Sequence, residues 1–421
     1  MTIPAPAEQT ANTRSVRTRC CIVGGGPAGM MLGLLLARGA VPVLVLEKHA
    51  DFLRDFRGDT VHPSTLDVLR QIGLLDAFLA LPHRKERTIA ARFADGDLTL
   101  GDFRGMRPFD YLALVPQWDF LDLLADAGRA LPRFSLAMRA EATTLRRDAQ
   151  GRVTGVVASD AQGEFAIDAD LVVACDGRGS RMRDCAGLPV DTFGAPMDVL
   201  WFRLPRAASD PDQTQGIPAR GRMLVMLDRD DYWQCAYLIR KGSGEALRAR
   251  PIDAFRELVA PLLPFDGARM QSLPDWNAVK TLEVRVDRLR RWHLPGLLLV
   301  GDAAHAMSPI GGVGINLAIQ DAVAAANLVG PALRGDGVID EALLARVQAR
   351  RMWPTRAVQA VQRIVQERLI TRLLDATPGG LLRAPWLLRR LVRLRAFRRI
   401  PARLFGYGLR RERVRFGPTS G

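Results

Sequence analysis

Residues 18–47 have the sequence TRCCIVGGGPAGMMLGLLLARGAVPVLVLE. Thr18–Val23 is a compact apolar run of strand length, and Pro27–Arg38 has the composition of an apolar helix that Gly39 closes. Val41–Leu46 is a second continuous apolar run, which is typical of a strand buried on both faces. Strand, helix and strand at this spacing predict a βαβ unit, which requires a parallel sheet.

The turn between the first strand and the helix fits the pattern G-x-G-x-x-G. Gly24 permits a tight turn, Gly26 lets the backbone approach a pyrophosphate, and Gly29 lets helix and strand pack closely. The helix offers free N–H groups and the positive end of its dipole to that diphosphate. Glu47, at the end of the second strand, can accept hydrogen bonds from ribose hydroxyls. The turn alone also fits an unrelated α/β domain, but the whole pattern predicts a dinucleotide site.

Two further segments deliver polar residues to the end of a strand. In 168–183, DADLVVACDGRGSRMR, a strand leads to Asp176-Gly177 and then to Arg183. In 297–316, LLLVGDAAHAMSPIGGVGIN, a strand ends at Gly301-Asp302, and a glycine-rich loop then opens an apolar helix. Free N–H groups at that helix start would stabilise negative charge. Each segment alone also fits an ordinary strand followed by a turn.

With these three motifs in this order, the chain resembles the single-component FAD-dependent aromatic hydroxylases, the p-hydroxybenzoate-hydroxylase-like monooxygenases. The resemblance covers about residues 18–350. It implies FAD, with its adenine end at 24–47, its ribitol at Asp302 and its flavin ring against 309–316. The cofactor-binding residues that it implies are Gly24, Gly26, Ala28, Gly29, Glu47, Lys48, Arg57, Gln117, Asp176, Gly177, Arg183, Gly301, Asp302, Pro309, Gly312, Gly314, Ile315 and Asn316.

The resemblance also implies the chemistry. NADH or NADPH reduces the flavin, dioxygen adds at the flavin C4a carbon, and the resulting hydroperoxide delivers one oxygen atom to the substrate. We therefore expect hydroxylation or epoxidation of an apolar aromatic, quinone-like or polyketide-like small molecule. No side chain is assigned as a catalytic residue; Pro309 and Gly312 are expected near the reactive carbon. No metal is expected, and the sequence has no G-x-S-x-G, H-E-x-x-H or P-loop motif.

The fold class expected is α/β: a Rossmann-like, glutathione-reductase-type FAD-binding domain with an inserted, mostly antiparallel substrate domain and a C-terminal helical tail. The expected boundaries are a flexible tail at 1–17, an FAD-binding domain at 18–80, 100–190 and 290–345, a substrate domain at 81–99 and 191–289, and an Arg-rich helical segment at 346–421.

Within the insertion, 222–228 and 232–240 alternate as strands with two candidate pocket faces. One face carries Met223, Val225 and Leu227, and the other carries Trp233, Cys235 and Tyr237. Either set can equally be ordinary core. Tyr232, Tyr237 and Arg220 are candidates for an activating base, and none of them is favoured.

Composition sets limits on the class of protein. With 421 residues, 48% hydrophobic and 25% charged, the chain is neither mostly disordered nor disulfide-stapled. Its five Cys form no CxxC pair, which predicts a reducing compartment, and the polar N-terminus lacks the apolar core of a signal peptide. A cytoplasmic protein is therefore expected.

The net charge of +14 is concentrated at the C-terminus, where twelve Arg and one Glu lie from Arg383 onward. A helix from Pro385 to Pro401 would carry leucines on one side and arginines on others. Residues 383–415 can therefore lie on an anionic membrane surface, or they can pack on the FAD-binding domain with their arginines in solvent. A nucleic-acid partner is disfavoured because stacking aromatic residues are missing.

Two other functions share most of these features. One is an FAD-dependent reductase of prenyl or polyene chains. The other is a non-catalytic, flavin-bearing, membrane-docked binding protein. Asp176 and Arg183 disfavour the second, because a mere binder needs no access for a nicotinamide donor. The choice between NADH and NADPH, and the oligomeric state, stay open.

Overall fold

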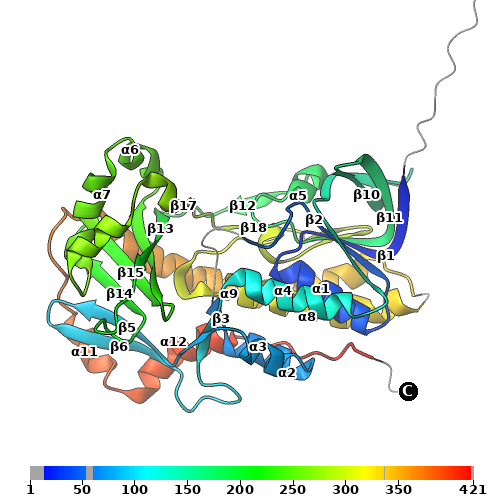
Figure 1. The fold of residues 1–421 in the computed structure, drawn as a ribbon. Helices are drawn as coiled ribbons and strands as arrows, with labels where there is room; N and C mark the ends of the chain where they lie inside the picture. The colour runs from blue at the N-terminus through cyan, green and yellow to red at the C-terminus, as the bar shows by residue number, and fades with distance from the viewer. Residues whose placement is uncertain (1–13, 54–59, 336, 419–421) are drawn as a thin grey trace, which may run out of the picture.

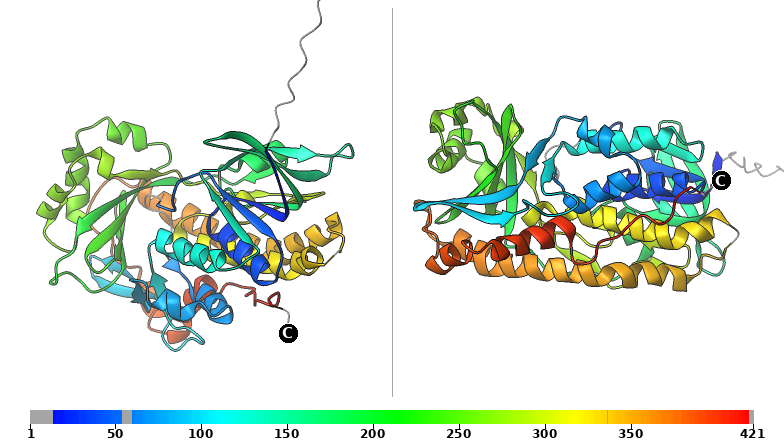
Figure 2. Two further views of the ribbon diagram at one scale, coloured as in Figure 1. Left: turned by 45° about the vertical axis from the view of Figure 1, so that its right-hand side comes forward. Right: turned by 90° about the horizontal axis from the view of Figure 1, so that it is seen from below.

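The computed structural model describes residues 14–53, 60–335 and 337–418. Two large sheets lie side by side, one built from strands within residues 15–174 and 293–299 and one mostly from strands within residues 197–282 (Figure 1). Long helices lie beneath the first sheet, and the C-terminal helices run beneath both sheets (Figure 2). The α/β fold class, with a mostly antiparallel insertion and a helical C-terminal region, is confirmed.

The first sheet has the strand order β19-β20-β11-β1-β2-β8, and β10 pairs with β11 and β9. Its strands are β1 (Ser15–Val23), β2 (Val43–Glu47), β8 (Phe134–Met138), β9 (Glu141–Arg147), β10 (Val153–Asp160), β11 (Gly163–Ala174), β19 (His293–Leu294) and β20 (Leu297–Leu299). Strand β1 pairs in parallel with β2 and β11, and β11 pairs in parallel with β20. The carboxyl ends of β20, β11, β1 and β2 are therefore neighbours, and these are the ends that carry the predicted motifs.

Strand β1 begins at Ser15, earlier than the expected start of the FAD-binding domain at residue 18. The expectation is wrong here because Ser15 pairs with Ala166 in the long strand β11, and the pairing continues without a break. Polar composition indicated a loose tail, whereas the partner strand extends the sheet.

One face of this sheet is covered by helices. Their bounds are α1 (Pro27–Arg38), α2 (Pro63–Gln71), α3 (Leu75–Leu79), α4 (Gln117–Arg129), α8 (Gly314–Arg334) and α9 (Glu341–Val365). Helix α1 packs between α4 and α8, and it buries ten of its twelve residues. Such complete burial explains why its sequence is apolar on every side.

Residues 63–79 form two helices. Helix α2 starts at Pro63 after the N-cap His62, and Gly73 (φ 73°) separates α2 from α3. Ser64 lies inside the first turn of α2, and its hydroxyl donates to Asn316 Oδ1 in α8 at 2.5 Å. This tertiary contact is not visible in local sequence.

The second sheet has the order β17-β13-β16-β15-β14-β5-β6, and of these pairs only β14–β5 is parallel. Its strands are β5 (Thr88–Phe93), β6 (Gly96–Asp102), β13 (Met197–Pro205), β14 (Gln215–Ala219), β15 (Arg222–Asp228), β16 (Tyr232–Arg240) and β17 (Lys280–Leu282). Strand β6 runs past the expected boundary at residue 99. The division into domains otherwise stays a prediction.

The two faces of the second sheet differ. Trp233, Cys235 and Tyr237 are buried in a core with Phe255 of α7 (Ile252–Val259). This set is therefore structural core, which was one of the two alternatives. Met223 and Val225 lie on the opposite face, in an apolar cluster that also includes Ile310, Val365 and Ile370.

The remaining helices and strands are mostly short. They are β3 (Thr60–Val61), β4 (Arg84–Glu86), β7 (Leu112–Leu114), α5 (Arg181–Ala186), β12 (Val190–Thr192), α6 (Gly244–Arg248), η1 (Ala260–Leu262), η2 (Gly267–Ser272), η3 (Trp276–Ala278), β18 (Asp287–Leu289), η4 (Gly301–Ala303), η5 (Ile310–Gly312), η6 (Gln366–Ile370), α10 (Thr371–Asp375), α11 (Trp386–Leu391) and α12 (Arg395–Tyr407). Strands β12 and β18 form a two-stranded antiparallel ribbon between the two large sheets (Figure 1).

The C-terminal helix predicted from Pro385 to Pro401 is broken into α11 and α12, and Pro401 lies inside α12. A proline in a helix interior removes one backbone hydrogen bond. Tertiary contacts hold α12 in place despite this loss: Ala402 is fully buried, and the Tyr407 hydroxyl bonds both the N–H and the carbonyl of Phe109.

One helical stretch among the described residues, Ile310–Arg334, is long and apolar enough to cross a membrane. However, 78% of its apolar window is buried inside the protein, where it packs against α1 and α9. The packing identifies this stretch as a core helix.

Candidate active site

The turn between β1 and α1 has the shape of an anion cradle. Gly24 takes φ 106°, and its N–H donates to Leu46 O at 2.8 Å. A Cβ on Gly29 would lie 2.0 Å from Gly24 O, whereas a Cβ on Gly26 would meet no protein atom within 4 Å. No side chain caps the α1 N-terminus. Backbone N–H groups there face open space, which is what a diphosphate requires.

The acid expected at the ribose is already held in place. Glu47 is 7% exposed, and its carboxylate accepts hydrogen bonds from Gly25 N (3.0 Å), His49 N (3.0 Å) and His49 Nδ1 (2.5 Å). These bonds fix the carboxylate beside the glycine turn. His49 was not predicted, although its position two residues after Glu47 suits a side chain that turns back onto the strand end.

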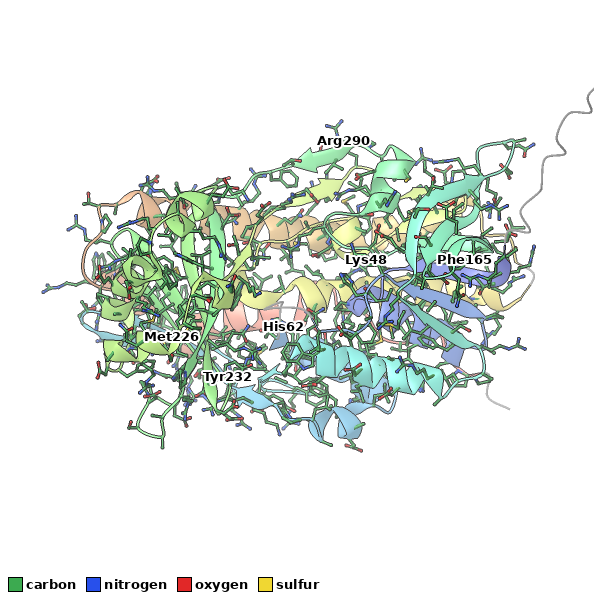
Figure 3. The ribbon with its side chains drawn as sticks, turned by 45° about the horizontal axis from the view of Figure 1, so that its top comes forward. Lys48, His62, Phe165, Met226, Tyr232 and Arg290 are labelled. Atoms are coloured by element: carbon green, nitrogen blue, oxygen red, sulfur yellow. The ribbon has the colours of Figure 1, made fainter. Side chains whose placement is uncertain are left out.

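Two weaker candidates are less well placed. Lys48 is exposed beyond the end of β2 (Figure 3), and Gln117 is half-buried as the first residue of α4. Arg57 lies outside the described residues. Their assignment to the cofactor stays a prediction.

Asp176 has a structural task as well as its predicted one. Its carboxylate accepts from Ser180 Oγ at 2.5 Å and from Met182 N at 3.1 Å, so it fixes the turn between β11 and α5, which includes Gly177. Burial raises the pKa of Asp176 above its usual value, although these hydrogen bonds oppose the shift.

Arg183 has buried donors that make no hydrogen bond within the described part of the chain. It is 8% exposed and donates from Nη2 to Arg178 O at 3.0 Å. Its Nε and Nη1 are buried and make no hydrogen bond within the described part of the chain, and the nearest carboxylate oxygen to Nη1 belongs to Asp287 at 3.7 Å. Buried donors without partners are costly, which fits a guanidinium that binds a ligand.

The Gly301-Asp302 pair follows β20, beside the ends of β11 and β1. Asp302 is half-buried, and Arg178 Nη2 lies 3.4 Å from its Oδ2. Gly301 approaches α1 so closely that a Cβ would lie 3.2 Å from Ala28 Cβ. The structure therefore brings the three predicted motifs together at one edge of the sheet.

A buried charge network, absent from the sequence predictions, supports this pair. Asp321 of α8 accepts from Gly301 N (3.1 Å), His305 Nε2 (2.6 Å) and Arg351 Nε (2.8 Å). Burial alone would raise the pKa of Asp321, but the charge and hydrogen bond of His305, with those of Arg351, hold it below its usual value. Asp321 thus fixes the loop after β20 to two helices.

The loop that the flavin ring is expected to contact is held from behind by glutamines of α9 and η6. Gln362 Nε2 donates to the carbonyls of Ser308 and Ile310, and Gln366 Nε2 donates to Ser308 Oγ. The loop contains Pro309 and Gly312, and the Gly312 N–H donates to Pro309 O at 3.0 Å. These contacts give the loop one backbone shape.

His62 holds the same loop from the other side. Its Nε2–H donates to Gly311 O at 3.1 Å, and it lies between the two sheets (Figure 3). Full burial lowers the pKa of His62 to about 4, so the ring is neutral at physiological pH. His62 was not predicted, and an isolated His before a proline gives no local signal for this role.

Helix α8 begins at Gly314 without a side-chain cap or an acidic residue in its first turn. A Cβ on Gly314 would meet nothing within 4 Å. Ile315 and Asn316 are buried, and Asn316 Oδ1 accepts from the hydroxyls of Ser64 and Thr65, so these two side chains serve packing. The start of α8 therefore offers a ligand its backbone N–H groups and the positive end of the helix dipole.

The described residues fit FAD. Gly26 and Gly314 leave open space at two uncapped helix starts, and Arg183 has buried donors without partners. Within the described ranges, no three His, Cys, Asp or Glu side chains are placed to hold a metal ion. The assignment of each residue to a part of FAD stays a prediction.

Comparisons with known proteins point the same way. Residues 17–362 match the family model described as "FAD binding domain". The chain is 33% identical over 358 residues to 6-methylpretetramide 4-monooxygenase of Streptomyces rimosus, with 84% of each chain covered. It is 31% identical over 307 residues to rifampicin monooxygenase of Streptomyces venezuelae, with 72% of this chain and 61% of that protein covered.

Among solved structures, PqsL of Pseudomonas aeruginosa, described as a probable FAD-dependent monooxygenase, superposes with a TM-score of 0.72. It is 21% identical, and the match covers 85% of this chain and 97% of that one, so it supports the fold. The matched family model and the first relative carry the identification. The chain belongs to the family of FAD-dependent aromatic hydroxylases and monooxygenases, and it is an oxidoreductase that uses FAD.

Proposed function

We propose that this enzyme uses NAD(P)H and dioxygen to hydroxylate an apolar, aromatic polyketide-like molecule. The observation that carries the proposal is an apolar cluster beside the 306–314 loop. Ile310 of that loop packs in one cluster with Trp201, Met223, Val225 and Leu238 on one face of the second sheet. A substrate next to this loop therefore meets an apolar wall.

The relatives support the same substrate class. Two relatives, 33% and 31% identical to this chain, are named for 6-methylpretetramide and rifampicin. An apolar wall with few polar groups suits such molecules, because burial of their ring surface drives binding while polar groups fix orientation.

Each end of FAD would have its own partners. The N–H groups at the start of α1 would hold the diphosphate, and Glu47 and Asp302 would accept hydrogen bonds from hydroxyls. The start of α8 would stabilise negative charge at the ring, because its dipole and N–H groups are free of acidic residues. The chemistry that bound FAD supplies is the transfer of electrons from NAD(P)H to dioxygen.

On the substrate side, Trp201 is the polar group best placed to orient a ligand. Its Nε1–H is buried and has no hydrogen-bond partner within the described part of the chain. A keto or hydroxyl oxygen on the substrate would satisfy that donor. Tyr237, considered above as a base, lies on the opposite, core face, and burial raises its pKa.

The test is turnover of a panel of aromatic polyketides with NAD(P)H under ¹⁸O₂. The expected result is a product that carries one labelled oxygen atom, with Trp201→Phe raising KM more than it lowers kcat. Trp353→Phe, which makes the same change at an exposed tryptophan of α9 outside the cluster, is the matched control. Reduction of a prenyl or polyene chain without oxygen incorporation would instead support the alternative reductase.

We also propose that the enzyme is cytoplasmic and that its C-terminal helices contact an anionic membrane surface. Trp386, Leu387, Leu394 and Ile400 are all more than half exposed, and arginines lie between them. Apolar side chains and arginines together suit binding to an interface. The segment that follows α12 is hydrogen-bonded to α9 through Glu412 and to α8 through Phe416. Contact with a membrane therefore uses the outer face of α11 and α12.

A further inference from the structure

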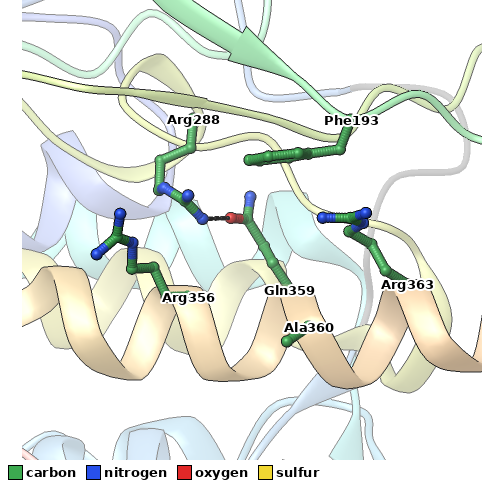
Figure 4. Close-up of a pocket in the computed structure, with 6 residues that line it drawn as sticks. All are labelled: Phe193, Arg288, Arg356, Gln359, Ala360 and Arg363. Atoms are coloured by element: carbon green, nitrogen blue, oxygen red, sulfur yellow. Dashed lines mark hydrogen bonds between the residues drawn. The ribbon is translucent and has the colours of Figure 1, made fainter.

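A cavity with a volume of about 200 Å³ lies between α9 and the β12–β18 ribbon. It is lined by Phe193 beside β12, by Arg288 of β18, and by Arg356, Gln359 and Arg363 on one face of α9 (Figure 4). Three guanidinium groups therefore face a single cavity. None of the residues discussed above as FAD contacts belongs to it.

The positive charge in this cavity is poorly neutralised. Arg288 donates to the neutral amide oxygen of Gln359 at 2.7 Å, and Arg356 has no acceptor within the described part of the chain. Arg363 lies 3.5 Å from Glu367, but its Nε is buried and makes no hydrogen bond there. Three guanidinium groups held together, with Arg363–Glu367 as the one ion pair found for them among the described residues, favour an anionic ligand.

The electrostatics of Arg288 point in the same direction. Burial, together with the charges of Arg356 and Arg363, lowers the pKa of Arg288, and nearby Asp191 opposes the shift. Like charges this close repel each other, so an anion between them would relieve the repulsion. The guanidinium groups of Arg288 and Arg363 lie 4.9 and 5.0 Å from the Phe193 ring centre, which gives them fixed positions.

The cavity is also connected to the loop at the active site. Gln359, which accepts from Arg288 through Oε1, donates from Nε2 to Ala306 O at 3.1 Å. Ala306 begins the loop that Gln362 and Gln366 hold. Gln359 therefore links the guanidinium group of Arg288 to the backbone of the flavin loop.

We infer that Arg288, Arg356 and Arg363 bind the 2′-phosphate of NADPH, and that NADPH is therefore the preferred electron donor. The inference rests on the proposed function. A phosphate monoester is a dianion at neutral pH, and it matches three guanidinium groups better than a hydroxyl does. NADH carries a hydroxyl at that position, so it lacks the group that this cavity fits.

The experiment is calorimetric titration of FAD-saturated enzyme with 2′,5′-ADP and with 5′-AMP, which differ only in the 2′-phosphate. The wild type should bind 2′,5′-ADP at least tenfold more tightly. Arg356→Ala and Arg363→Ala should each remove about tenfold of that difference, and Arg356→Lys should restore part of it. Arg346→Ala, which changes an exposed arginine on the same helix outside the cavity, is the matched control.

Equal binding of the two nucleotides, or a 2′,5′-ADP affinity that both alanine variants leave unchanged, would overturn the inference. A third titration with benzoate separates a substrate carboxylate from the phosphate: weaker benzoate binding in the variants without weaker 2′,5′-ADP binding would also overturn it. Kinetics separate the two levels of the account. Equal kcat/KM for NADH and NADPH would contradict the inference alone, whereas oxidation of neither donor would contradict the proposed function.

Discussion

Asp321 Oδ1 accepts a hydrogen bond of 2.8 Å from Arg351 Nε, and the two side chains are 0% and 1% exposed. This ion pair joins α8 to α9. The other carboxylate oxygen of Asp321, Oδ2, accepts from Gly301 N and His305 Nε2, so the same carboxylate holds the loop expected at the FAD ribitol. Glu412, from the C-terminal segment, lies 3.5 Å from Arg351 and extends the network.

Asp321→Asn should therefore destabilise the protein strongly. The variant keeps the shape but leaves the buried guanidinium of Arg351 without its main counter-charge, and breaking a buried pair from one side costs about 3–5 kcal/mol. The double variant Asp321→Asn/Arg351→Met should lose less, because no buried charge is left unpaired. Urea unfolding of both variants measures this, and a loss below about 1 kcal/mol in the single variant would contradict it.

Alanine at Gly26 should lower the affinity for FAD, whereas alanine at Gly29 should lower the stability of the apoprotein. Gly26→Ala places its Cβ where no protein atom lies within 4 Å. The free energy of unfolding of the apoprotein should therefore stay within about 0.5 kcal/mol of the wild-type value. FAD affinity should nevertheless fall at least tenfold, because the methyl group fills the space left for the diphosphate. Fluorescence titration of the apoprotein with FAD measures the affinity, and wild-type affinity in Gly26→Ala would reject the placement.

Gly29→Ala is the matched comparison. Its Cβ would lie 2.0 Å from Gly24 O, so helix α1 has to shift, at a cost of about 1–3 kcal/mol in the apoprotein. A variant that folded as stably as wild type would show that the turn is looser than described.

Stability should fall as pH drops from 6.5 toward 4, in part because of His62. Its pKa is about 4 in the folded protein and about 6.5 when unfolded, so the unfolded state takes up the proton first. The loss through this window reaches about 3 kcal/mol. His62→Gln keeps an N–H donor for Gly311 O without the titration, so its stability should vary less between pH 6.5 and 4.5. Identical pH slopes for the two proteins would contradict the role of His62.

Membrane contact through α11 and α12 can be tested without removing the segment. Trp386→Ala/Leu394→Ala changes two exposed side chains, and it should reduce co-sedimentation with phosphatidylglycerol vesicles at 0.1 M salt by severalfold. Val338→Ala, which changes an apolar residue that is 80% exposed before α9, is the control. Failure of the wild type to sediment with these vesicles would reject the contact.

The parts of the site that the sequence predicted were those set by local backbone geometry. Gly24, Gly26 and Gly29 follow from one turn, and Asp302 follows from a strand end, so their spacing alone carries the information. Parallel pairing of neighbouring strands then explains why the separate motifs meet.

The parts that were missed depend on tertiary contacts. Asp321 and Arg351 look like solvent-facing residues of two helices, and only packing reveals that they are a buried pair. Gln359, Gln362 and Gln366 did leave a signal, because their spacing places three amides on one helical face toward the 306–310 loop.

The C-terminal segment shows the same limit. Its arginines left open either a helix on a membrane surface or one packed on the FAD-binding domain. Near its end, Phe416 is 5% exposed and fills the space in front of Gly39 and Gly330. The Glu412 carboxylate accepts two hydrogen bonds from Arg350, at 2.9 and 3.0 Å. Phe416 and Glu412 therefore fix the segment to α1, α8 and α9. The charge count gave no indication of these contacts.

The measurement that tests the central claim most directly is the visible absorbance of the purified protein, reconstituted with FAD, during addition of NADPH under nitrogen and then of oxygen. The account predicts about one FAD per chain, loss of the flavin absorbance with NADPH, and its return with oxygen. A protein that takes up no FAD, or that holds FAD which neither NADPH nor NADH can reduce, would contradict the account.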